Sequence, residues 1–209
     1  MNVETQPIQI IKPVSRQVDE LADLVTIFDP GVQVCSFSRN LDADIIDFLE
    51  QSSTAGAFQV IENCGIQSEL QLARLPSGRG RDVLLADLTL LKDIMIDLMG
   101  CPTVGLRMAQ TDQAMCPGWH FDKTSIRLVC TYKGPGTQWV KNQDLNRHSL
   151  RSQNHQEQPF YQASEGEIVL LKGSLWQNNE AYGAIHRSPA VDASEGLRMV
   201  VTIDPLWND

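Results

Sequence analysis

The chain has 209 residues, of which 42% are hydrophobic and 21% charged, so it can bury a core of one domain and is not expected to be disordered. Its 26 acidic and 17 basic side chains give a net charge of -9. No run of Lys and Arg supplies the positive charge that binding to phosphate backbones needs, so nucleic acid is not an expected partner. No stretch has the roughly 18 to 20 uninterrupted apolar residues of a membrane span.

The amino-terminal sequence and the cysteines predict a cytoplasmic protein. The start, MNVETQPIQIIKPVSRQ, has neither the basic region nor the long apolar region of a signal peptide. The five cysteines contain no CxxC pair and are odd in number, which argues against a disulfide framework and against a zinc ribbon. We therefore expect reduced, partly buried thiols.

The first half of the chain predicts two helices. Residues 1–38 mix short apolar runs with turn residues and indicate no definite element. A helix is expected after Asn40, a capping-type residue, because LDADIIDFLEQ places two aspartates in the first turn, where the helix dipole favours negative charge. The segment LARLPSGRGRD predicts a loop. Residues 82–99 give the clearest helical pattern, with apolar residues at three- and four-residue steps and Gly100 and Pro102 to end it.

The second half has the character of β-strands. The segments TVGLRMAQ, SIRLVCTY, GTQWV, GEIVLLKG and LRMVVTID are short, rich in β-branched residues and separated by turn residues. This order predicts an α+β, mainly β fold: an antiparallel sandwich or barrel with the helices packed outside. We expect residues 1–101 to form a helical and mixed part that buttresses a barrel of residues 102–209, together one domain. The polar segment 141–165 predicts a long loop, and we interpret it as a substrate lid.

The segment GWHFDKTSIRLVCTYKGPGTQWV contains the first candidate ligands, His120 and Asp122. In extended backbone, residues i and i+2 point to the same side, so these two side chains can converge on one metal ion. His186, in GAIHRSP, is the candidate third ligand, and Arg198 follows twelve residues later. Two histidines and one carboxylate leave other coordination positions open, which suits non-haem Fe(II). An arginine can hold a co-substrate carboxylate at two points.

The order His-x-Asp, a later His, then Arg resembles that of the Fe(II)- and 2-oxoglutarate-dependent oxygenases. The resemblance implies a double-stranded β-helix, a jelly-roll or cupin-like fold, and hydroxylation of a small-molecule or peptide substrate. It further implies that His120, Asp122 and His186 hold Fe(II), and that Arg198 binds the distal carboxylate of 2-oxoglutarate. The nucleic-acid demethylases of this class carry further arginine and asparagine residues on the last strand, and LRMVVTID has none after its arginine.

A second resemblance covers the chain from about residue 35 onward. The segments HFDKTSIRLVCTYKGPGTQWV and LLKGSLW…GAIHRSP are similar to an uncharacterised family, domain of unknown function 1826. This resemblance implies no activity.

Each candidate has a structural alternative. His120 and Asp122 also suit a hydrogen-bonded turn, His186 a structural role, and Arg198 an ion pair with a carboxylate such as Asp204. In these cases the chain would be an interaction domain that keeps the motif only as structure. The sequence gives no indication of oligomeric state.

Three further residues complete the candidate site. Arg127 and Tyr132, on the strand after the first two ligands, suit either orientation of a co-substrate or packing at the edge of the core. Cys116 suits either a fourth, zinc-favouring ligand or a buried small residue. A ligating Cys116 would favour Zn(II) over Fe(II), and the chain would then be a non-catalytic, zinc-binding or metal-handling cupin-like protein.

Overall fold

The computed structural model describes residues 12–52, 56–70, 75, 77–143, 145, 150, 158–192 and 196–207. These residues form three helices, which are the 3-10 helix η1 (Leu21–Phe28), α1 (Ala43–Ser52) and α2 (Arg81–Met99). They also form ten strands, in chain order β1 (Val14–Val18), β2 (Val32–Phe37), β3 (Phe58–Gly65), β4 (Thr103–Thr111), β5 (Ile126–Lys133), β6 (Gln138–Val140), β7 (Phe160–Gln162), β8 (Ile168–Lys172), β9 (His186–Arg187) and β10 (Arg198–Leu206).

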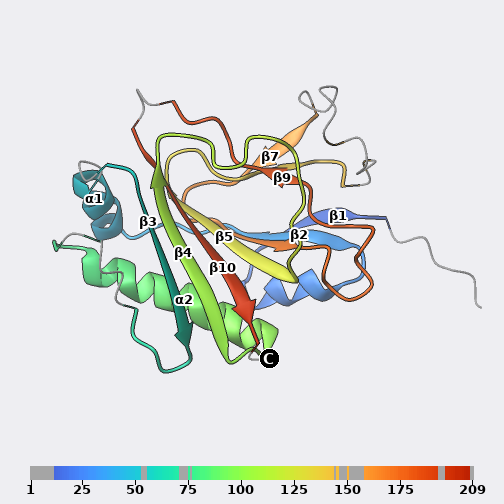
Figure 1. Ribbon diagram of the computed structural model, residues 1–209, viewed down its shortest axis with the longest axis horizontal. Helices are drawn as coiled ribbons and strands as arrows, with labels where there is room; N and C mark the ends of the chain where they lie inside the picture. Colours follow the sequence, from blue (N-terminus) through green and yellow to red (C-terminus); the bar gives the residue numbers. More distant parts are fainter. Residues whose placement is uncertain are drawn as a thin grey trace, which may run out of the picture.

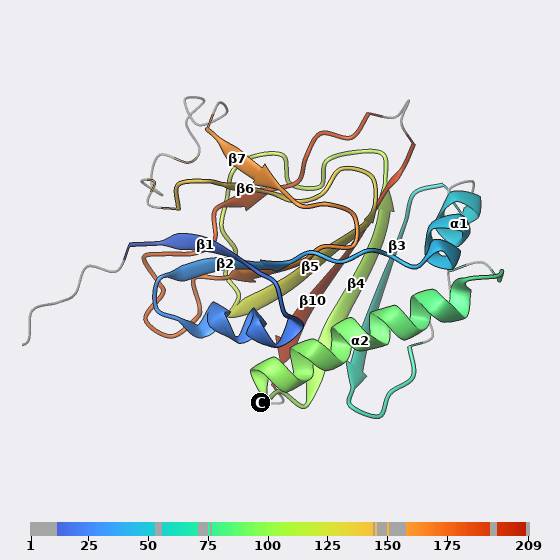
Figure 2. The same cartoon turned by 180° about the vertical axis from the view of Figure 1, so that it is seen from behind.

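The elements lie in three layers, which can be followed in Figure 1 and from behind in Figure 2. The central layer is a seven-stranded sheet in the order β1-β2-β8-β5-β10-β4-β3, antiparallel except for the pair β1 and β2. A three-stranded sheet, β7-β6-β9, covers one face, and α2 and η1 cover the other. A large apolar core fills the space between helices and sheet, and a smaller one lies between the two sheets.

Helix α2 forms where the apolar pattern predicts it. Leu84, Leu88, Leu91 and Met95 recur on one face and are fully buried against the central sheet. Burial of each such side chain contributes about 1.5 to 3 kcal/mol, so this face anchors the helix. The helix ends at Gly100, which adopts the left-handed conformation that favours glycine.

Helix α1 begins two residues later than the capping pattern suggested. The side chain of Asp42, rather than that of Asn40, accepts a hydrogen bond from the backbone N–H of Asp44 at 2.8 Å. Gly80, just before α2, has a φ of 88°, and a Cβ there would lie 2.1 Å from the carbonyl oxygen of Asp44. The start of α2 can approach α1 this closely because Gly80, at the point of contact, has no side chain.

The amino-terminal part contributes more than helices. Strands β1, β2 and β3 come from the segments before residue 101 for which the sequence gave no clear prediction, and they form both ends of the central sheet. The two parts expected for residues 1–101 and 102–209 therefore share one hydrogen-bonded sheet. The division at residue 101 stays a prediction about folding units.

The segment 141–165 is not only a loop. It contains β7, which pairs with β6. Residues 144, 146–149 and 151–157 lie outside the described residues, and the lid interpretation falls mainly on them. Among the described helices, none combines the length and the apolar character needed to span a bilayer.

Strand β10 connects the core to the inner face of the sandwich. Met199, Val201 and Ile203 belong to the core under the helices, whereas Arg198 and Val200 face the three-stranded sheet. This strict alternation places a charged side chain inside the space between the two sheets.

Candidate metal centre

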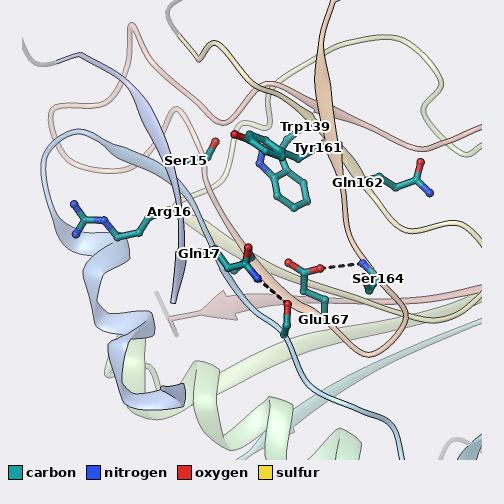
Figure 3. A pocket seen from close by; sticks show the side chains of 10 residues that line it. Ser15, Arg16, Gln17, Trp139, Tyr161, Gln162, Ser164 and Glu167 are labelled. Carbon is teal, nitrogen blue, oxygen red and sulfur yellow. Dashed lines mark hydrogen bonds between the residues drawn. The ribbon is translucent and has the colours of Figure 1, made fainter. Parts of the chain in front are cut away.

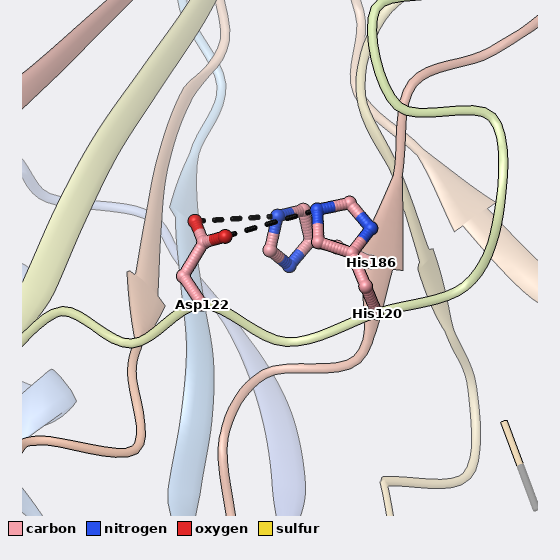
Figure 4. A group of neighbouring side chains, drawn as sticks. All are labelled: His120, Asp122 and His186. Atoms are coloured by element: carbon pink, nitrogen blue, oxygen red, sulfur yellow. Dashed lines mark ion pairs between the residues drawn. The ribbon is translucent and has the colours of Figure 1, made fainter. Parts of the chain in front are cut away.

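His120, Asp122 and His186 meet at one point between the sheets (Figure 4). One ligand atom from each residue lies within 4.8 Å of the other two. His186 begins β9, and His120 lies directly opposite in a short antiparallel bridge in which each backbone N–H donates to the other's carbonyl oxygen. The two histidines are thus fixed relative to each other by backbone hydrogen bonds, and their rings lie 4.4 Å apart between centroids.

Both imidazoles have a defined tautomer. The Nδ1 of His120 lies 2.8 Å from the carbonyl oxygen of Gly118, and that of His186 lies 2.8 Å from the carbonyl oxygen of Ala184. A carbonyl only accepts hydrogen bonds, so each Nδ1 carries a proton, and in the neutral ring the lone pair is then on Nε2. Metal-binding histidines are oriented by the same kind of hydrogen bond from the other ring nitrogen.

Burial keeps His186 neutral. Its side chain is 8% exposed. Removal from water lowers the pKa of His186 to about 4, and the nearby carboxylate of Asp122 only partly opposes this effect. At neutral pH, the imidazole therefore presents a free lone pair to the space it shares with Asp122.

Asp122 is held by an arginine rather than by the histidines. Its Oδ2 lies 2.5 Å from Nη1 of Arg127, and the same guanidinium donates two further hydrogen bonds, each 2.8 Å, to Asp204. The backbone carbonyl of Asp122 accepts hydrogen bonds from the N–H and hydroxyl of Ser174. Although burial acts to lower the pKa of Arg127, the two carboxylates raise it, so the cation is permanent.

The three ligand atoms fit a small divalent ion. Nε2 of His120 lies 3.7 Å from Oδ1 of Asp122, and Nε2 of His186 lies 3.6 Å from Oδ2, which is too long for hydrogen bonds. Two ligand atoms about 2.1 Å from one ion lie about 3.0 to 3.4 Å apart, so each of these two histidine–carboxylate distances exceeds that range by only a few tenths of an ångström. Two imidazoles and one carboxylate form the donor set of the facial triad.

Arg198 is buried in the same inner space and has no carboxylate partner among the described residues. Its side chain is 1% exposed. Nε donates to the carbonyl of Pro135 at 2.7 Å, and Nη2 donates to the hydroxyls of Thr131 and Thr137 at 3.2 Å each. Burial lowers the pKa of Arg198 to about 10. The alternative pairing with Asp204 is not found, because both oxygens of that carboxylate bind another arginine.

One cavity of about 90 Å³ connects these groups. It is lined by His120, His186, Arg107, Arg127, Arg187, Arg198, Met115, Cys116, Val129, Thr137, Ser188, Val200 and Thr202. Two of the candidate ligands and the buried guanidinium therefore share one cavity.

The structure brings Cys116 to this cavity but not into the cluster of ligand atoms. Cys116 is exposed and lies outside the group of three residues whose ligand atoms converge. Tyr132 does not reach the cavity at all. It lies on the other face of β5, within the core under the helices, and its hydroxyl donates to Asp87 of α2. Arg127 lines the cavity, and all its described partners are carboxylates of the protein.

A larger cleft, of about 290 Å³, lies elsewhere, between β1 and β2 on one side and β6 and β7 on the other (Figure 3). Trp139 and Tyr161 form its wall, and Gln17, Ser164 and Glu167 are among its polar groups. It has no histidine and no cysteine among its lining residues. This cleft is larger than the cavity at the triad, but it lacks the imidazole and thiolate donors that transition metals favour.

Several residues around Arg198 and the cavity were not identified from the sequence. Thr131 and Thr137 contact Arg198 because β5 and the turn after it bring them across from β10. The alternation of β5 would have identified Thr131, which shares a face with Arg127. Arg107 and Arg187 lie on β4 and β9, and no spacing rule connects them to the triad.

Comparison with solved structures identifies the class of fold. The chain is similar to a rice dioxygenase for auxin oxidation (14% identity, TM-score 0.53, 89% of this chain and 78% of that chain). It is equally similar to the dioxygenase for auxin oxidation 1 from Arabidopsis thaliana in a 2-oxoglutarate complex (10% identity, TM-score 0.53, 94% and 93%) and to a putative oxygenase from Shewanella oneidensis (11% identity, TM-score 0.53, 92% and 89%). The fold is thus the double-stranded β-helix of 2-oxoglutarate oxygenases, as predicted.

The family follows from the sequence itself. Residues 18–204 match the family model described as protein of unknown function (DUF1826), and the chain belongs to this family. The predicted resemblance is confirmed, and it begins earlier than the expected residue 35. No curated protein matches the chain.

Proposed function

We propose that this protein is an Fe(II)- and 2-oxoglutarate-dependent oxygenase that hydroxylates an organic substrate. The observation that carries the proposal is a two-histidine, one-carboxylate cluster whose two histidines line the same cavity as a buried guanidinium that has no carboxylate partner among the described residues. A buried, unpaired charge is costly, and an anionic ligand would offset that cost. The shared fold with oxygenases supports the same reading.

Nε2 of His120, Nε2 of His186 and the carboxylate of Asp122 would hold the iron. When bound, Fe(II) supplies the activation of O₂ and the oxidation of the substrate. The protein keeps both imidazoles in the ligating tautomer through the carbonyls of Gly118 and Ala184. Arg127 fixes the direction of the carboxylate, as groups around metal ligands commonly do.

Arg198 would hold the co-substrate. A guanidinium binds a carboxylate through two parallel, charge-assisted hydrogen bonds, which also fix its orientation. The hydroxyls of Thr131 and Thr137, both buried beside the guanidinium, orient it and can donate to the same anion. Burial removes competing water and strengthens the ion pair.

Anaerobic metal titration of the purified apoprotein tests the proposal. We expect a weak visible absorption band that requires both Fe(II) and 2-oxoglutarate, and succinate formation when O₂ is admitted. His186→Gln and Asp122→Asn should abolish the band. The control is Arg79→Gln, since Arg79 is 88% exposed in a loop and pairs only with Asp44 among the described contacts.

The same titration separates the alternative function. Tight Zn(II) binding that is indifferent to 2-oxoglutarate and lost in Cys116→Ser would replace the oxygenase by a zinc protein. Absence of any metal binding, with unchanged stability in Asp122→Asn, would leave the triad as a structural feature only.

A further inference from the structure

The cavity at the triad is strongly cationic in a protein whose net charge is -9. Four of the eleven arginines in the chain, Arg107, Arg127, Arg187 and Arg198, line it, and no Asp or Glu does. A low-dielectric cleft lined by one sign of charge attracts ligands of the opposite sign. The question is which of these charges remain after the iron site and the co-substrate are accounted for.

Two of the four charges are used by the proposed function. Arg127 is neutralised by Asp122 and Asp204, and Arg198 is reserved for 2-oxoglutarate. When Fe(II) and the 2-oxoglutarate dianion are bound, their charges cancel each other. The negative charges of Asp122 and Asp204 likewise cancel the positive charges of Arg127 and Arg198. The remaining arginines, on β4 and β9, leave a double positive charge in the cavity.

Arg187 is held in place without being neutralised. Its guanidinium carbon lies 4.1 Å from the ring centroid of Trp119, and its Nε donates to the amide oxygen of Gln138 at 2.7 Å. The ring stabilises the cation without supplying a formal negative charge. Among the described residues, no carboxylate lies within ion-pair distance of this guanidinium.

Arg107 is exposed at the mouth of the cavity and likewise has no ion pair in the described part of the chain. Its direct cross-strand neighbours are Ile61 on β3 and Thr202 on β10, which are uncharged. The nearest acidic position on this face is Asp204, diagonal across β10, and both its oxygens already bind Arg127. The side chain is therefore available to a ligand.

We infer that the substrate carries an anionic group, a carboxylate or a phosphate, which Arg107 and Arg187 bind at the outer part of the cavity. The inference rests on the proposed function, because it assigns Arg198 to the co-substrate. The wall beside these arginines contains Met115, which is 40% exposed, and Cys116. A small molecule with an apolar body and one anionic end matches this lining.

Binding of matched small probes tests the inference. The protein is first loaded anaerobically with Fe(II) and 2-oxoglutarate, and formation of the absorption band reports on the proposed function by itself. Benzoate and phenyl phosphate, each at millimolar concentrations, are then compared with neutral benzamide by isothermal titration calorimetry. We expect either or both anions to bind at least about tenfold more tightly than the amide, with affinity that falls as salt is added.

Substitutions identify the groups responsible. Arg107→Gln and Arg187→Gln should each weaken binding of the anion about ten- to a hundredfold, the effect of one charge-assisted hydrogen bond, and should leave benzamide unchanged. Arg107→Lys, which keeps the charge, should retain most of the affinity, and Arg79→Gln serves as the matched loss of charge far from the cavity. A band that forms normally in all four variants shows that the folded site persists.

Three results would overturn the inference while the proposed function stands: equal binding of amide and anions, no binding of either anion, or unchanged affinity in the two Gln variants. If instead the band never forms, the proposed function fails. The titration is then repeated on the metal-free protein, where loss of anion binding in Arg107→Gln supports an anion site and unchanged binding refutes it.

Discussion

Replacement of Arg198 by methionine separates its proposed role in binding 2-oxoglutarate from a purely structural role. The side chain is 1% exposed, has no carboxylate partner among the described residues and donates hydrogen bonds to Pro135, Thr131 and Thr137. Methionine matches the unbranched stem of arginine and carries no charge, so Arg198→Met removes the cation and keeps the packing of the stem.

The effect on stability is the difference of two opposing terms. Burial that lowers the pKa of Arg198 to about 10 corresponds to about 3 kcal/mol of cost for the charged form. Removal of the guanidinium relieves this cost but leaves the carbonyl of Pro135 without its hydrogen bond, which costs about 1 to 3 kcal/mol. The free energy of unfolding of the ligand-free variant should therefore stay within about 2 kcal/mol of wild type.

The effect of Arg198→Met on 2-oxoglutarate binding has no opposing term. Truncation of one partner of a buried, hydrogen-bonded charge pair costs about 2 to 5 kcal/mol, so the dissociation constant should rise about 30- to 5000-fold. Calorimetric titration with the Fe(II)-loaded protein, together with denaturant unfolding of the ligand-free protein, gives both quantities. Unchanged affinity for 2-oxoglutarate, combined with a loss of stability above about 3 kcal/mol, would refute the reasoning and make Arg198 a structural residue.

Three further predictions concern the surroundings of the triad. Arg127→Met leaves two partly buried carboxylates unpaired, so it should weaken metal binding about ten- to a hundredfold and lower the free energy of unfolding by about 1 to 3 kcal/mol. Unchanged metal affinity would show that Arg127 does not orient Asp122. The pKa of His186 is about 4 in the folded protein and about 6.5 in the unfolded chain, so the unfolded chain binds more protons between these pH values. The free energy of unfolding of the metal-free protein should therefore fall by up to about 3 kcal/mol as pH drops from 6.5 to 4. A His186→Gln variant whose free energy of unfolding depends on pH in the same way would contradict this. Tyr132→Phe should cost about 1 to 3 kcal/mol through its lost hydrogen bond to Asp87 and leave 2-oxoglutarate affinity unchanged, whereas weakened co-substrate binding would bring the tyrosine back to the site.

The fold was predictable where one local pattern dominates. The apolar spacing of residues 82–99 gave α2 to within one residue, because a helix that buries one face must repeat at three and four residues. Strands β1 and β2 gave no comparable signal. Every residue of β2 except the last is buried, since its two faces contact both layers, and a strand buried on both faces loses the alternation that identifies it.

The site was predictable from spacing only in part. His120, Asp122 and His186 converge as expected, because two of them are close in sequence and the third lies opposite across a backbone bridge. The prediction that Tyr132 and Arg127 share the site was wrong for a reason visible in the sequence, since residues five apart on one strand point to opposite faces. The partner of Arg127 was not predictable, because its ion pair with Asp204 joins positions 77 residues apart.

The position of Arg127 explains how the three side chains of the triad can converge without a metal ion. A carboxylate facing two imidazoles in a buried space needs a compensating positive charge, which a metal ion would supply. Here the guanidinium supplies it in advance, since it contacts Asp122 through one nitrogen and Asp204 through two. Because only one Asp122 oxygen contacts Arg127, the other remains free to face the ion, and metal binding does not require the ion pair to break. We therefore expect the chain to stay folded without a metal, unlike small domains in which the metal supplies the folding free energy.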